Sequence, residues 1–172
     1  MYKIIVFFFV LFVSTSSFAA VDDINSTLKD DAAAEAQFAI GLMYYEGQGV
    51  PQDYKEALKW YRLAAEQGKL EAQYNLGLMY AKGGGVPQDF KEAVKWISLA
   101  AGQGDADAQY MLGLMYANGD GVPQHNVEAY AWATVARANG YDAARELMSD
   151  VAKVMTPVQI EKAQELAKKY FK

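Results

Sequence analysis

The fold is decided by a stretch that reads Ala72-Gln-Tyr-Asn-Leu-Gly-Leu-Met-Tyr80, then Gly83-Gly-Gly-Val-Pro87, Ala93-Val-Lys-Trp96 and Ala100-Ala-Gly-Gln-Gly104. The same pattern occurs 36 residues earlier and 36 residues later without insertion, as shown by Ala36, Ala72 and Ala108, by Gly41, Gly77 and Gly113, and by Trp60, Trp96 and Trp132. Residues 33–68 and 69–104 are identical at 23 of 36 positions, and residues 105–140 keep the motif before diverging. Three repeats of one structural unit therefore organise the chain.

Each unit predicts two helices joined by a glycine-rich loop. In the first unit, apolar residues recur on one helical face across residues 34–45. That helix ends at Gly47-Gln-Gly-Val-Pro51, because two glycines and a proline do not continue a helix. The second helix begins after Asp53, a residue suited to capping it, and Glu56 is placed to complete a capping box. The second unit repeats this pair as Asp89 and Glu92.

Small residues inside the helices predict close packing. A glycine in a helix interior costs roughly 1 kcal/mol relative to alanine, so a glycine kept three times indicates close helix–helix approach. The tryptophans are expected to fill the space between consecutive units. The variation at Tyr61, Ile97 and Ala133 is interpreted as an adjustment of packing. One hairpin cannot bury its apolar surface alone, so the units must stack into a solenoid.

The C-terminal residues 141–172 predict a pair of capping helices. Residues 141–155 occupy the register of a fourth first helix, but Ser149 replaces the glycine. Thr156 and Pro157 then cap and start a last helix, Pro157–Tyr170. The fold class is therefore all-α, an α/α solenoid of three helical hairpins with a C-terminal cap.

The first 19 residues predict a secretory signal peptide. A short basic start is followed by the apolar run Ile4–Val13, and small residues precede a cut after Ala19. Residues 20–32 form an N-terminal segment in which Val21–Leu28 is expected to be a short N-terminal counterpart of the C-terminal cap. The mature protein is expected in the periplasm or outside the cell, without stable membrane insertion.

Composition excludes several classes of function. Removing Lys3 with the leader leaves 15 basic against 21 acidic residues, a formal net charge of −6. This acidity argues against nucleic acid or anionic membrane as a partner. The absence of cysteine excludes disulfides and a thiol nucleophile.

The combination Ala-x-Gln-x-x-Leu-Gly-x-Met-Tyr-x-x-Gly-x-Gly-Val-Pro, followed by Ala-x-x-Trp-x-x-x-Ala-Ala-x-x-Gly, resembles the Sel1-like repeat, a relative of tetratricopeptide-type solenoids. The resemblance covers residues 33–140. It implies a right-handed α/α superhelix that binds proteins, and it implies that the first helices line a concave groove. Bacterial members of the family are often exported adaptors, envelope regulators or factors in host contact. Some cysteine-rich secreted members are linked to β-lactam binding, a pattern from which this cysteine-free chain departs.

Catalytic groups are sparse, and we expect no enzyme activity, cofactor or metal. His125, the single histidine, stands in the slot of the capping aspartates and is interpreted as a surface turn residue beside a capping Asn126. Ser26, Ser98 and Ser149 lack the context of a nucleophile. Residues 118–121, Asn-Gly-Asp-Gly, faintly resemble a calcium loop but are interpreted as a turn, since further oxygen ligands are missing.

Exposed positions that differ between repeats are the candidates for partner binding. They form a stripe on the first helices, made of positions seven residues apart: Ala39, Glu46, Asn75, Lys82, Met111 and Asn118. Drift on a solvated face is the alternative explanation. The function predicted is a monomeric adaptor or regulator that binds a peptide or a partner domain, possibly basic. The alternatives are an inhibitor or immunity protein against a toxin or envelope sensor and, less favoured, a β-lactam-binding or hydrolase activity.

Overall fold

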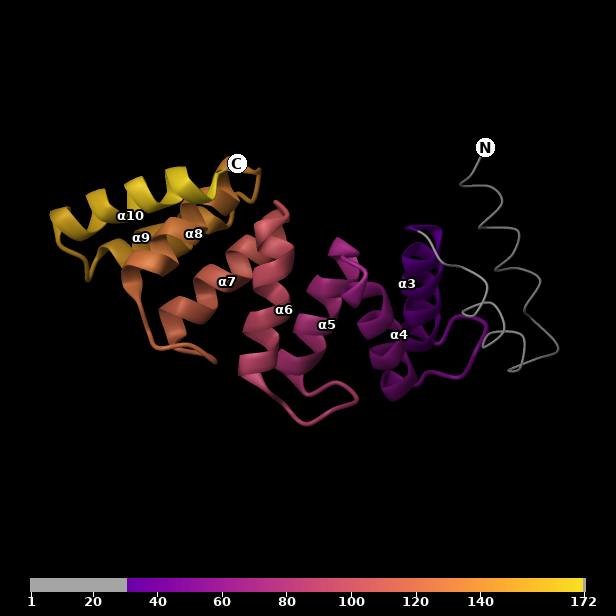
Figure 1. The fold of residues 1–172 in the computed structure, drawn as a ribbon. Coiled ribbons are helices and arrows are strands. Elements are labelled where there is room, and N and C mark those ends of the chain that lie inside the picture. The colour runs from indigo at the N-terminus through magenta and orange to yellow at the C-terminus, as the bar shows by residue number, and fades with distance from the viewer. Residues whose placement is uncertain (1–30, 172) are drawn as a thin grey trace. The chain divides into compact units, whose positions relative to one another are not determined.

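The computed structural model describes residues 31–171, and every regular element in this range is an α-helix (Figure 1). The helices are α3 (Asp31–Glu46), α4 (Tyr54–Glu66), α5 (Leu70–Lys82), α6 (Phe90–Gly102), α7 (Ala106–Asn118), α8 (Asn126–Ala138), α9 (Ala144–Ala152) and α10 (Pro157–Tyr170). The prediction of an all-α fold built from repeated helical hairpins is confirmed. The predicted leader at residues 1–19 and the predicted N-terminal counterpart at Val21–Leu28 lie outside the described residues.

The chain divides into two compact units, residues 1–72 and 73–172, which are described separately. In the first unit α3 and α4 pack against each other as a hairpin. In the second unit α6 packs on α7, α7 on α8, and α8 on both α9 and α10. In the second unit, the helices from α6 to α9 that follow one another in the sequence are therefore also neighbours in space, as expected for stacked hairpins.

The loop between the two helices of each repeat is held by a glutamine that returns to the preceding helix. The Nε2 atoms of Gln52, Gln88 and Gln124 donate to the carbonyl oxygens of Tyr45, Ala81 and Ala117 at 2.8, 2.7 and 2.7 Å. In the third repeat, Gly119 ends α7 in the left-handed conformation, with a φ of 81° that favours glycine. A Cβ atom on Gly121 would collide with the Phe90 carbonyl at the start of α6, so this loop packs on the preceding repeat.

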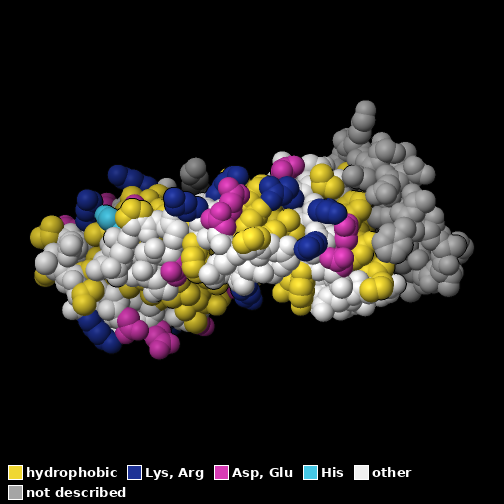
Figure 2. Space-filling view, turned by 90° about the horizontal axis from the view of Figure 1, so that it is seen from below, with side chains coloured by type: hydrophobic (Ala, Val, Ile, Leu, Met, Phe, Trp, Pro, Cys, Tyr) yellow, Lys and Arg dark blue, Asp and Glu magenta, His cyan; other side chains and the backbone are white. Residues whose placement is uncertain are grey.

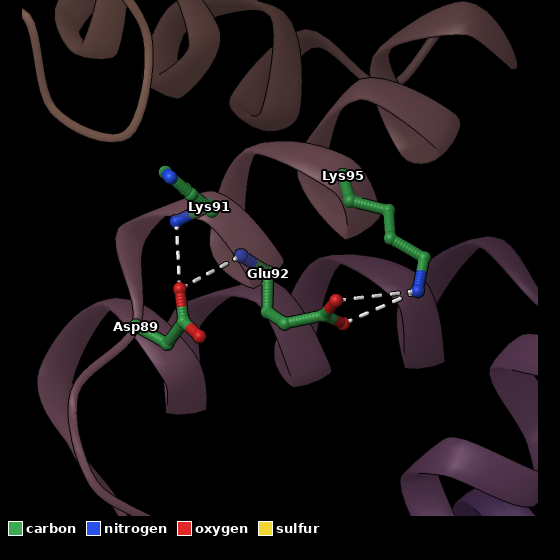
Figure 3. Close-up of polar contacts among 4 residues, drawn as sticks. All are labelled: Asp89, Lys91, Glu92 and Lys95. Carbon is green, nitrogen blue, oxygen red and sulfur yellow. Dashed lines mark hydrogen bonds and ion pairs between the residues drawn. The ribbon is translucent and has the colours of Figure 1, made fainter.

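The predicted N-caps are confirmed, but the predicted capping boxes of α4 and α6 are wrong. The Asp89 carboxylate accepts hydrogen bonds from the backbone N–H groups of Lys91 and Glu92 at 2.9 and 3.2 Å (Figure 3). The Glu92 carboxylate instead pairs with Lys95 at 3.2 Å. It cannot complete the box because the Asp89 N–H already donates to the carbonyl of Tyr80. The same arrangement joins Asp53, Glu56 and Lys59 in α4.

His125 caps α8, which corrects the expectation that Asn126 takes that role. His125 adopts the extended conformation of an N-cap residue, and its Nδ1 atom accepts from the Glu128 N–H at 3.2 Å. Its own N–H donates to the Tyr116 carbonyl, as the capping aspartates donate to the equivalent carbonyls. The side chain is exposed and appears as the cyan group in Figure 2.

The repeated glycine of the first helices lies against the second helix of the same repeat, as predicted. A Cβ atom on Gly77 would stand 2.5 Å from Cγ1 of Ile97, and one on Gly41 would stand 2.6 Å from the Tyr61 ring. In the third repeat the small residue Ala133 stands where the other repeats have Tyr61 and Ile97. There, Cδ2 of Leu147 in α9 would lie 3.2 Å from a Cβ atom placed on Gly113. The side chain opposite each glycine therefore compensates for local differences in packing.

Buried glutamines connect helix ends in a way that hydrophobic periodicity does not predict. Gln109 is 2 % exposed, and its Oε1 accepts from the Nδ2 of Asn139, which follows α8, at 2.8 Å. Its Nε2 donates to the carbonyl of Ala101 in α6 at 3.1 Å, so one side chain connects three helices. The equivalent pairs are Gln103 to Gln73 at 2.7 Å and, in the first unit, Gln67 to Gln37 at 2.6 Å.

The C-terminal helices close the second unit. Trp132 stacks on Tyr170 with ring centroids 4.3 Å apart, and the Tyr170 hydroxyl donates to the Glu128 carboxylate at 2.9 Å. Trp132 thus fills space between the last repeat and the cap, whereas the prediction placed the tryptophans between consecutive repeats. Trp60 and Trp96 are buried. The capping box of Thr156 at α10 is present. The preceding helix is shorter than the predicted span of residues 141–155, because turns occupy its first and last residues.

Candidate protein-binding surface

The six candidate residues lie on the first helices of the repeats, and each unit holds its own set. In the first unit Ala39 is half-buried in α3 and Glu46 is exposed at its end. In the second unit Asn75 and Met111 are half-buried, while Lys82 and Asn118 are exposed at the ends of α5 and α7. Among the described residues no hydrogen bond or ion pair joins any two of the six. Their assignment to partner binding stays a prediction.

Two of these candidates interact with the neighbouring loop. Gln48 donates a side-chain hydrogen bond to the Glu46 carboxylate. The Asn118 amide donates to the Asp120 carboxylate at 3.1 Å. This bond joins two side chains of the segment that faintly resembles a calcium loop. It is consistent with the interpretation of residues 118–121 as a turn. Asn75, Lys82 and Met111 make no side-chain hydrogen bond or ion pair within the described part of the chain.

A second recurrent position on the first helices was missed by the sequence reasoning. Phe38, Tyr74 and Tyr110 occupy the same position of the three repeats. In the first and third repeats the residue 31 positions later, Lys69 or Tyr141, lies next to the ring. In the first unit the Lys69 Nζ lies 5.8 Å from the centroid of the Phe38 ring. The same ammonium is 2.7 Å from Glu35 and 2.8 Å from Glu71. Phe38, Glu35 and Glu71 therefore form an ammonium site that the chain's own lysine fills.

The electrostatics of this site follow from its geometry. Partial burial of Lys69 opposes its charge, but the two carboxylates outweigh that effect and raise the Lys69 pKa above its usual value. The hydrogen bond from Lys69 in turn lowers the pKa of Glu71. Since both side chains of each pair remain partly exposed, water screens the attraction and its contribution to stability is modest.

In the second unit the equivalent positions hold tyrosines. Tyr110 stacks on Tyr141 with ring centroids 4.5 Å apart and an interplanar angle of 23°. Tyr74 is half-buried, and burial raises its pKa to about 12, with further contributions from the carboxylates of Asp107 and Asp105. The signal in the sequence was the recurrence of an aromatic residue at positions 38, 74 and 110.

The histidine and the two described serines that were considered as catalytic candidates lie on, or at the start of, three different helices, α8, α6 and α9. No group of three or more His, Asp or Glu side chains within residues 31–171 is placed to hold a metal ion. The imidazole of His125 caps a helix, Ser149 is exposed on α9, Ser98 is half-buried on α6, and Ser26 lies outside the described range. None of the helices in this range combines the length and apolar character that crossing a membrane requires.

Comparison with known proteins identifies the repeat. The family model of the Sel1 repeat matches residues 34–69, 70–105 and 106–141. A crystal structure of a protective antigen from uropathogenic Escherichia coli, described as displaying an SLR fold, is 36 % identical, with a TM-score of 0.74 over 80 % of this chain and 29 % of the antigen. A Sel1 repeat protein from Oxalobacter formigenes is 39 % identical, with a TM-score of 0.66 over 76 % of this chain and 98 % of that protein. No curated protein matches the sequence. The three matched repeats establish that the chain belongs to the Sel1 repeat family.

Proposed function

We propose that this chain is an exported, non-enzymatic interaction module whose first helices bind a peptide or a domain of a partner protein. Sel1 repeats are generally protein–protein interaction modules. The observation that carries the proposal is a difference within the second unit between residues that recur in every repeat and residues that vary. Residues that recur in every repeat, such as Gln109 and Gly77, make the internal contacts, whereas Asn75, Lys82 and Met111 differ between repeats, and their side chains make no hydrogen bond or ion pair within residues 31–171.

Such a surface suits recognition for physical reasons. A half-buried methionine such as Met111 is flexible and polarisable and adapts to apolar groups. A partner can accept hydrogen bonds from the side chains of Lys82 and Asn75 without breaking a hydrogen bond among the described residues. A few such contacts carry most of the affinity of an interface, and charge contributes mainly to selectivity. The net negative charge of the chain favours a basic partner.

The test is capture of partners from the cell envelope by chemical crosslinking to the mature chain, residues 20–172. The triple variant Asn75→Ala, Lys82→Ala, Met111→Ala should lose a partner that the parent chain captures. Its melting temperature should be nearly unchanged, because none of the three side chains makes a hydrogen bond or ion pair within the part of the chain that the structure describes. Capture that survives the triple change would show that the first helices of the second unit are not the binding surface.

A matched control carries three changes at exposed positions of the second helices and the cap: Leu99→Ala, Arg137→Ala and Glu161→Ala. It should retain capture, so that a loss in both variants would indicate a general effect on the protein. Tight one-to-one binding of a single toxin or sensor would favour the inhibitor alternative. Turnover or covalent labelling by a β-lactam would favour the catalytic one.

Export is tested separately by intact mass spectrometry of the chain expressed in a bacterial host. We expect the periplasmic or secreted protein to begin at Ala20, after loss of residues 1–19. A protein of full length that stays in the cytoplasm would contradict this part of the proposal.

A further inference from the structure

An apolar groove lies between α8 and α10, which pack against each other in the second unit (Figure 1). Its volume is about 460 Å³, within the range of about 300–1,000 Å³ that is usual for binding pockets. Val135 and Ala167 line it and are almost fully buried, whereas Ala138 and Phe171 line it and remain exposed. The Phe171 side chain is 53 % exposed, so a segment that covered this ring would gain from its burial.

The walls of the groove are held in place by contacts within the unit. The Tyr170 ring stacks on Trp132 and its hydroxyl donates to Glu128, which ties the end of α10 to α8. The Thr134 hydroxyl, on the α8 side of the groove, donates to the Tyr130 carbonyl at 2.7 Å. Since this hydroxyl already has an acceptor, an apolar side chain that contacts Thr134 leaves no donor unpaired. The groove is therefore formed before any segment enters it.

The groove also has a sign of charge, opposite to that of the chain as a whole. None of the described residues that line it is acidic, and the last turn of α10 carries Lys168 and Lys169. Lys168 lines the groove and pairs with Glu165 at 2.6 Å, while Lys169 makes no hydrogen bond or ion pair within residues 31–171. An apolar groove with lysines beside it complements a segment that combines apolar anchors with acidic residues.

The chain itself contains such a segment. In residues 20–30, which precede α3 and lie outside the described residues, acidic residues outnumber basic ones by three to one. Val21, Ile24 and Leu28 follow one another at the i, i+3 and i+7 spacing by which a helix presents anchors to a groove. The segment adjoins the first unit, whereas the groove belongs to the second. Two copies of the chain can therefore each offer what the other accepts.

We propose that the groove between α8 and α10 of one chain binds residues 20–30 of a second copy and so joins the copies head to tail. Because each copy has one segment and one groove, the contact is between unlike surfaces and builds open chains or closed rings. The first helices take no part in it, so the proposal does not depend on the proposed function. It replaces the expectation of a monomer with reversible self-association.

The groove is tested first with a synthetic peptide of residues 20–30, added to the isotope-labelled mature chain and followed by NMR. We expect saturable shifts of the resonances of Thr134, Ala138, Lys168 and Phe171. A control peptide with Ile24→Ser and Leu28→Ser has the same charge and should cause no such shifts. Equal shifts with both peptides, or shifts that avoid α8 and α10, would overturn the proposal.

Self-association is then measured by sedimentation velocity of the mature chain over a wide range of concentration. Phe171→Ala should weaken it roughly four- to ten-fold, because about half of the burial of an aromatic side chain is lost. Val158→Ala removes an apolar side chain of α10 that is 73 % exposed and does not line the groove, and it should associate as the parent does. Equal weakening in both variants would contradict the site.

A pair of charge variants on α10 separates the groove from general electrostatics. Lys168→Gln should weaken association by up to about five-fold, whereas Lys162→Gln, the same change at an exposed position that does not line the groove, should have no effect. Weakening by Lys162→Gln as large as that by Lys168→Gln would show that only the net charge matters and would overturn the role of the groove.

Mixing two defective chains tests the head-to-tail arrangement. One chain carries Phe171→Ala and Lys168→Gln and keeps its segment, and the other carries Ile24→Ser and Leu28→Ser and keeps its groove. Each alone should associate more weakly than the parent, and the mixture should form one-to-one dimers but no longer assemblies. A mixture that associates no better than its components would overturn the arrangement. A mature chain that stays monomeric at every concentration would overturn the proposed assembly even if the peptide binds.

Discussion

Replacing Gly77 tests whether the repeat is built on close contact between its two helices. A Cβ atom at this position would lie 2.5 Å from Cγ1 of Ile97, 3.2 Å from the Ile97 backbone nitrogen and 3.3 Å from the Ala93 carbonyl oxygen. The Ile97 side chain is fully buried, so it has little room to move away. Two of the three contacts are with backbone, which can give way only by separating α5 from α6.

The magnitude follows from two opposing effects. Alanine at 77 gains up to about 1 kcal/mol in helix propensity over glycine. Overpacking a buried contact costs about 1–3 kcal/mol, so Gly77→Ala should lose between about 0 and 2 kcal/mol of stability. Valine adds two methyl groups to the same contact and is a poorer helix former, so Gly77→Val should lose about 3 kcal/mol or more. A loss of this size lowers the melting temperature by roughly 6–12 °C for a domain of this length.

The assay is thermal and urea unfolding followed by circular dichroism. The control is Gly102→Ala at the end of α6, where an added Cβ meets no atom within 4 Å and the change should be neutral or stabilising by up to about 1 kcal/mol. Combining Gly77→Ala with Ile97→Ala, the residue that the third repeat has at the equivalent position 133, should cost less than the sum of the single changes. An unchanged melt of Gly77→Val, or strict additivity in the double variant, would refute the packing argument.

Three further changes test the caps, the buried glutamines and the last helix. His125→Asp should stabilise the protein by about 0.5–1 kcal/mol in chemical unfolding, because aspartate is the better N-cap; a loss would show that the imidazole has another role. Gln109→Ala should cost about 2–4 kcal/mol, since it removes a buried side chain and leaves the Asn139 amide without its acceptor; a cost under about 0.5 kcal/mol would contradict the connecting role. Burial and the hydrogen bond to Glu128 raise the pKa of Tyr170, so the neutral hydroxyl contributes stability below its ordinary pKa of about 10 that is lost as the pH rises through the raised value. Tyr170→Phe should therefore flatten the fall of the melting temperature above about pH 10, and an unchanged alkaline fall would exclude this contact as its cause.

Much of the fold could be predicted because the repeat gives three independent copies of each local signal. Asp53 and Asp89 were identified as caps, and the last helix was placed at Pro157–Tyr170, from residues that act within a few positions of one another. The capping box failed because the Asp89 N–H is used by the carbonyl of Tyr80, nine residues earlier, and local spacing does not reveal that bond.

Contacts between distant segments were not predictable in the same way. Gln73 and Gln109 recur in a polar slot of an apolar helix, and that recurrence was the available signal for burial. Their partners follow 30 residues later, where only stacking of helix ends brings the amides together. The ammonium site around Lys69 likewise needs two distant segments, residues 35–38 and 69–71, to meet. The candidate binding residues were recognised only as positions that differ between repeats, which does not distinguish recognition from drift.

The most direct test of the account is site-specific photocrosslinking in cells of the native organism. A photoreactive amino acid is placed at position 111, on the first helix of the third repeat, and at position 99, which is exposed on the second helix of the repeat before it. We predict that position 111 gives a discrete crosslink to one partner protein and that position 99 gives none. Crosslinks of equal yield from both positions, or from position 99 alone, would contradict the claim that the first helices form the binding surface.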